Sequence, residues 1–90
     1  MDGLPPPQYD HVPSIPLIEQ VLATKAEANT ICIGIIGKKS EPEGTMWWGC
    51  SIRKVKDGHL VCYIYRIDNE LVKRHEHGHC NGWGNDHKGG

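Results

Sequence analysis

Residues 75–79 read His-Glu-His-Gly-His, an H-E-x-x-H pattern, and they restrict what this chain can fold into more than any other stretch. On an α-helix, residues four apart lie one above the other on the same face. His75 and His79 can therefore direct two imidazole rings at one metal ion. Glu76 lies one position further around the helix, within reach of a water molecule on that ion, where it can act as a general base. The pattern predicts a helix that carries a metal site.

The residues around the motif also favour a helix, which we place at residues 68–80. Asp68 is a suitable N-cap. Leu71 continues the row of the two outer histidines towards the start of the helix, and we expect this row to be buried. Asn81 and Gly82 follow the motif, and glycine commonly occupies the left-handed position after a helix. The chain can then turn back towards the metal.

A third ligand is expected after this turn. Catalytic zinc usually has three protein ligands and one open position, and Asp86 and His87 both follow Gly82 closely. Either could complete the set. We select His87, because imidazole is the commonest metal ligand, and expect Asp86 to accept a hydrogen bond near the site. The alternative interpretation is a His-rich surface helix that binds stray metal or none.

Residues 75–87, HEHGHCNGWGNDH, resemble the zincin metallopeptidases and are most similar to the metzincin-type pattern HExxHxxGxxH/D. The resemblance implies zinc bound by the two outer histidines of the motif, a general-base role for Glu76 and a turn at Gly82. The metzincin third-ligand position falls on Asn85, a poor zinc ligand, and no methionine follows the motif. The string HCNGW followed by D-H, together with PPPQYDH near the N-terminus, is also similar to small bacterial zincin-like proteins.

Size and charge limit the remaining possibilities. Ninety residues predict one small domain, which we divide into an extended Pro-rich arm (residues 1–16) and a zincin-like domain (residues 17–90). The net charge of −1 gives no electrostatic reason to bind nucleic acid or an anionic membrane. The zincin resemblance implies a peptide or protein substrate, and we expect a monomer. No signal peptide is visible, so the chain is either cytoplasmic or exported with its leader absent.

The first half of the domain predicts a strand and a helix. Residues 17–22, LIEQVL, suit a short strand, and Thr24 begins a capping box for a helix that Gly37 would end. The alternative is a helix over residues 15–27 and a strand over the β-branched residues 30–33.

A β-hairpin is the clearest prediction in the second half. Residues 46–56 and 59–66 are rich in strand-forming side chains and are joined by Asp57-Gly58, which favours a type I′ turn. The resulting order of strand, helix, hairpin and helix predicts an α+β fold. We expect a zincin-like core, in which a twisted, antiparallel-containing sheet has one backing helix and carries the H-E-x-x-H helix at its C-terminal end.

The hairpin register restricts the pairing of the cysteines. In this register Cys50 and Cys62 point to opposite faces of the sheet, so a disulfide between them would require the register to slip. Cys32 could meet one of them and Cys80 the other. In the cytosol all would stay reduced.

Three functions fit these features. The first is a zinc-dependent metallopeptidase that uses Zn²⁺ and Glu76 to activate water, and the alternative is a non-catalytic, zinc-stabilised binding or inhibitory module. The third is a metal-buffering protein, which would use His75, His77, His79 and Cys80. For the peptidase, an exposed sheet edge could hold an extended substrate, and Trp83 could line the cleft or simply pack. Candidates for stabilising the oxyanion are Tyr63, Tyr65 and His59.

Overall fold

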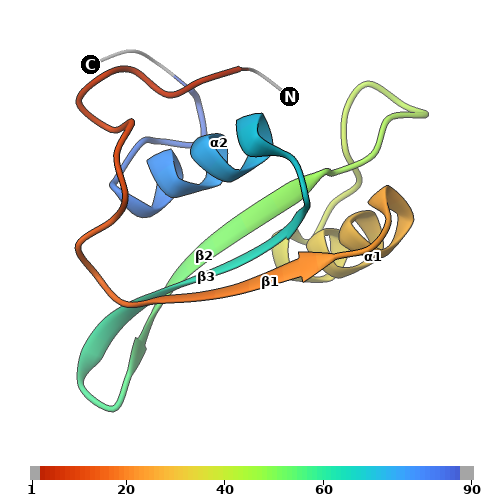
Figure 1. Ribbon diagram of the computed structural model, residues 1–90. Coiled ribbons are helices and arrows are strands. Elements are labelled where there is room, and N and C mark those ends of the chain that lie inside the picture. Colours follow the sequence, from red (N-terminus) through yellow and green to blue (C-terminus); the bar gives the residue numbers. More distant parts are fainter. Residues whose placement is uncertain (1–2, 88–90) are drawn as a thin grey trace.

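The computed structural model describes residues 3–87, and its element order is the predicted strand, helix, hairpin and helix (Figure 1). The elements are β1 (Leu17–Leu22), α1 (Lys25–Ile36), β2 (Gly49–Lys56), β3 (His59–Ile67) and α2 (Glu70–Cys80). The alternative with a helix over residues 15–27 is wrong. Within residues 3–87, no helix has the length and apolar character needed to cross a membrane.

The strands form a three-stranded mixed sheet in the order β1-β3-β2. β1 runs parallel to β3, whereas β2 and β3 form the predicted antiparallel hairpin. Asp57 and Gly58 have φ values of 53° and 80°, the left-handed backbone that a type I′ turn requires. This turn pairs Lys56 with His59, as predicted. The molecule is therefore a small α+β domain.

The two helices lie on opposite faces of this sheet (Figure 1). A disulfide between Cys32 and Cys50 joins α1 to β2, and a second between Cys62 and Cys80 joins β3 to α2. Because Cys50 pairs with Tyr65 and not with Cys62, the two bridges leave the sheet on different sides. The predicted exclusion of a bond between Cys50 and Cys62 is confirmed, and Cys32 and Cys80 are the partners.

Local signals set the ends of the helices and strands, with small differences from prediction. Thr24 accepts a hydrogen bond from the Glu27 N–H, and α1 ends at Gly37 in left-handed backbone, as expected. α2 is capped by Asn69 and not by Asp68, because the Asn69 side chain accepts from the backbone N–H groups of Leu71 and Val72 in the first turn. β2 begins at Gly49 and not at residue 46, since the Trp47 N–H donates to the Asn29 side chain of α1 and not to a strand.

The N-terminal arm lies against α2 on the side away from the sheet (Figure 1). Asp10 forms an ion pair with Arg74, and the Asn81 side chain donates a hydrogen bond to the Tyr9 carbonyl at 2.8 Å. The Arg74 hydrogen bond lowers the pKa of the Asp10 carboxyl, although burial opposes the shift. α2 is thus held between the sheet and the arm, which positions the residues described next.

Candidate metal centre

Three histidines converge at the C-terminal end of α2. α2 presents His75 and His79, and the chain after Gly82 (φ 103°) turns back and brings His87 to them. The Nε2 atom of His75 lies 3.1 Å from His79 Nε2 and 3.2 Å from His87 Nε2. The potential ligand atoms of the three residues all lie within 4.8 Å of one another, so this cluster could hold a metal ion.

Backbone carbonyls fix the orientation of two of these rings. His75 Nδ1 lies 2.7 Å from the Gly3 carbonyl, and His79 Nδ1 lies 2.8 Å from the Trp83 carbonyl. A carbonyl can only accept a hydrogen bond, so each Nδ1 carries the proton. In a neutral ring the Nε2 lone pair is then available and faces the cluster. Metal-binding histidines are usually held by such a second hydrogen bond.

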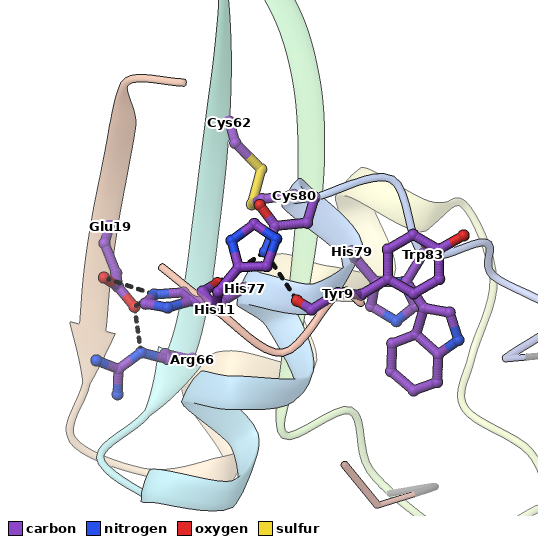
Figure 2. The surroundings of a disulfide bond; sticks show 10 residues. Tyr9, His11, Glu19, Cys62, Arg66, His77, His79, Cys80 and Trp83 are labelled. Atoms are coloured by element: carbon purple, nitrogen blue, oxygen red, sulfur yellow. Dashed lines mark hydrogen bonds and ion pairs between the residues drawn. A yellow bond between two sulfur atoms is a disulfide. The ribbon is translucent and has the colours of Figure 1, made fainter. Parts of the chain in front are cut away.

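Trp83 and Gly78 enclose the cluster. The Trp83 ring is 4% exposed and stacks on the His79 ring, with centroids 4.8 Å apart (Figure 2). Gly78 allows this close packing, because a Cβ at this position would lie 2.6 Å from Pro5 and 3.1 Å from Trp83. Burial lowers the pKa of His79, and this effect outweighs the hydrogen bond to the Trp83 carbonyl, which raises the pKa. The ring is therefore neutral near pH 7, the form that binds metal.

The loop after α2 separates the candidate third ligands. The His87 backbone lies in the left-handed region (φ 58°), and its N–H donates to the Gly84 carbonyl at 3.0 Å. This bend directs His87 to the other two histidines. Asp86 is exposed and its carboxylate lies beside Gly84, outside the three-histidine cluster. Asn85, at the metzincin third-ligand position, is exposed and lines a groove beside the cluster.

Glu76 faces the sheet and not open solvent. Its side chain is buried over Gly49 of β2, and the Ser51 side chain forms a hydrogen bond with it. Burial raises the pKa of Glu76 to about 7, although the Ser51 hydrogen bond opposes the shift. A carboxyl with a pKa near neutrality is suited to accept and return a proton.

The expectation of a buried row through Leu71 is wrong. Leu71 is 57% exposed, whereas Val72 is 1% exposed and Cys80 is 4% exposed. The sheet therefore covers the row that contains Glu76, and His75 is buried instead by the arm and the C-terminal loop. From the spacing alone, the row through Leu71 and the row through Glu76 are equally suited to face the core. Packing of α2 on β2 and β3 decides which of them is buried.

His77 takes part in a different cluster, on the side of α2 that faces β1. Its Nε2 lies 3.3 Å from Glu19 Oε2, and the same carboxylate oxygen accepts a hydrogen bond from Arg66 Nε at 2.5 Å (Figure 2). Burial raises the pKa of Glu19, but the hydrogen bonds from Arg66 and His77 outweigh it and the net shift is downward. Because Cys80 is in a disulfide, the set expected for metal buffering is not assembled.

An open groove of about 510 Å³ lies between β2 and the loop after α2. Its lining residues are Ser51, Ile52, Arg53, Leu60, His79, Gly82, Trp83, Gly84 and Asn85. Of these lining residues, Ser51 is the hydrogen-bond partner of Glu76, and His79 belongs to the histidine cluster. The three expected oxyanion candidates are wrong, because the register puts Tyr63, Tyr65 and His59 on the sheet face that α1 covers.

Comparison of the chain with protein-family models, with curated proteins and with solved structures finds no match. Function must therefore be inferred from the site itself. Several parts of the site were not predicted from the sequence, namely the carbonyls of Gly3 and Trp83 and the hydroxyl of Ser51. Backbone carbonyls are present at every position, so the sequence carries no signal for those two. Gly78 was the available hint, since a glycine inside a helix often marks a close approach of other chain segments.

Proposed function

We propose that this protein is a small zinc-dependent peptidase with a zincin-like site, in which His75, His79 and His87 hold Zn²⁺. The supporting observation is the convergence of three Nε2 atoms, two of them oriented by carbonyls on Nδ1. Zinc–nitrogen bonds of about 2.0–2.1 Å at tetrahedral angles put neighbouring nitrogens about 3.3 Å apart. The two measured separations, 3.1 and 3.2 Å, fit this value.

The number of ligands favours a catalytic site over a structural one. Within residues 3–87 the cluster comprises three potential ligands, and catalytic zinc has three protein ligands and one open position. A bound zinc ion makes water more acidic and polarises a carbonyl group. The resemblance of residues 75–87 to the zincin motif supports the same assignment.

Glu76 is the proposed general base. Its carboxylate would accept the proton of the attacking water and deliver it to the leaving amine. The pKa of about 7 suits both transfers at neutral pH. Ser51, its hydrogen-bond partner, lines the groove next to His79 and would hold the carboxylate at the base of that groove.

The second candidate function is a zinc-stabilised binding module without catalysis. The burial of Glu76 favours it, because a carboxyl that is 3% exposed has little access to water. In this case the three histidines would stabilise the fold and the groove would bind a partner without cleaving it.

The experiment that separates the two compares the wild type with Glu76→Gln. Zinc content is measured in both, together with cleavage of a peptide library. A peptidase should keep its zinc in the variant and lose cleavage, because the amide cannot accept a proton. Glu70→Gln is the matched control, since Glu70 lies exposed at the start of the same helix. Zinc-loaded wild type that cleaves nothing would exclude the peptidase and support the binding module.

The two disulfides indicate the kind of cellular compartment in which the protein acts. Disulfides persist in oxidising compartments and are rare in the cytosol. Both bridges join a helix to the sheet. They favour an exported protein over a cytoplasmic one.

A further inference from the structure

β2 presents an open edge beside the histidine cluster. It is an outer strand of the sheet, paired on one side with β3. The Trp48 carbonyl accepts from the Ile67 N–H at 3.0 Å, and antiparallel pairs alternate between hydrogen-bonded and non-hydrogen-bonded. Ser51 and Arg53 therefore direct their N–H and C=O groups away from β3. An extended peptide can pair with such an edge.

Arg53 lies on the same sheet face as the histidine cluster. It pairs with Cys62, whose disulfide leads to α2, and it lines the groove together with His79. Its side chain is exposed, and within residues 3–87 no Asp or Glu lies within ion-pair distance of it. The guanidinium is thus available to a carboxylate that enters the groove.

The charge of the groove is one-sided. Arg53 is its permanently charged lining residue, and none of its lining residues within the described range 3–87 is acidic. Further along the same face, Val55 and Leu60 are cross-strand partners that are 73% and 42% exposed. The open edge thus offers a cation followed, two residues further along β2, by an apolar surface.

We propose that Arg53 selects peptides that carry an Asp or Glu side chain facing it and an apolar side chain two residues away, over Val55 and Leu60. Alternate residues of an extended peptide point to the same side, which matches the two-residue spacing of Arg53 and Val55. Arginine binds carboxylates through two parallel N–H donors. The proposal depends on the proposed function only in assuming that the substrate occupies this groove. Peptide binding can be measured without cleavage, so it tests the proposal separately.

The binding test uses zinc-loaded Glu76→Gln protein and fluorescent octapeptides with Glu or Lys at one position and Leu two residues away. Binding of the Glu peptide should be about tenfold tighter at low salt, and this preference should shrink as salt screens the pair. Arg53→Glu should reverse the preference. Lys54→Glu makes the same charge change on the next residue, which is exposed on the opposite sheet face, and should leave the preference unchanged.

A charged side chain on an edge strand also protects against aggregation. If this were the only role of Arg53, the Glu and Lys peptides would bind equally well. Equal binding, or an equal response to Arg53→Glu and Lys54→Glu, would overturn the proposal. Cleavage by the wild type without any acidic preference would overturn it too, while leaving the peptidase intact. Acidic preference in binding, with no cleavage by the wild type, would support it and exclude the peptidase.

Discussion

Replacing Gly78 with alanine tests how α2, the arm and the C-terminal loop fit together. A Cβ on Gly78 would lie 2.6 and 2.7 Å from two carbons of Pro5 and 3.1 Å from Trp83. Non-bonded carbons are normally about 3.5–4.0 Å apart. Gly34 is the matched control, because it is also the third residue from the end of its helix and a Cβ there meets nothing within 4 Å.

The two substitutions should have opposite effects on stability. Alanine is favoured over glycine inside a helix by up to about 1 kcal/mol, so Gly34→Ala should stabilise the protein by roughly this amount. At Gly78 the same gain is opposed by overpacking, which costs about 1–3 kcal/mol. We expect Gly78→Ala to lower the free energy of unfolding by about 0–2 kcal/mol, and to be less stable than Gly34→Ala by about 1–3 kcal/mol.

Gly78→Ala should also weaken metal binding. Pro5 follows closely after Gly3, whose carbonyl orients His75, and the Trp83 carbonyl orients His79. Displacing either segment disturbs a hydrogen bond of the kind that is worth about 10–100-fold in metal affinity. Gly34→Ala lies on the other side of the sheet and should leave the zinc affinity unchanged.

Both effects can be measured directly. Urea unfolding of the metal-free variants gives the stability difference, and competition with a chromophoric chelator gives the zinc affinity. If Gly78→Ala gains as much stability as Gly34→Ala and binds zinc as tightly as the wild type, the arm does not pack on α2 as described. The proposed support of His75 by the Gly3 carbonyl would then be wrong.

The remaining predictions concern the third ligand, the disulfides and acid stability. His87→Ala should cost far more zinc affinity in a calorimetric titration than Asp86→Ala, and the reverse ranking would make Asp86 the ligand. Each disulfide closes a loop of 18 residues, so reducing either should cost about 3 kcal/mol in a urea titration with and without reductant, and an unchanged midpoint would contradict this. The pKa of Glu19 is lowered by Arg66 despite its burial, so its stabilisation is present above the usual pKa of 4.5 and is lost as the pH falls through the folded-state value. Unfolding of metal-free Glu19→Gln should therefore depend less steeply on pH below about 4.5 than that of the wild type, and identical slopes would argue against the ion pair.

The sequence by itself determined the features that depend on neighbouring residues. Asp57-Gly58 fixes a two-residue turn, the turn fixes the register of β2 and β3, and the register excludes a bond between Cys50 and Cys62. Thr24 and Gly37 likewise mark the ends of α1. Each of these depends on backbone preferences and hydrogen bonds within a few residues, so the pattern of side chains is enough to predict it.

Only the tertiary structure decided which groups surround the histidines. Rows through Leu71 and through Glu76 are equally possible from spacing, and contact with the sheet selected the row through Glu76. The Gly3 carbonyl reaches His75 across 72 residues, and the bend at His87 depends on how the last loop packs. Such long-range contacts follow from the shapes that meet in the folded chain, for which the local sequence carries no signal.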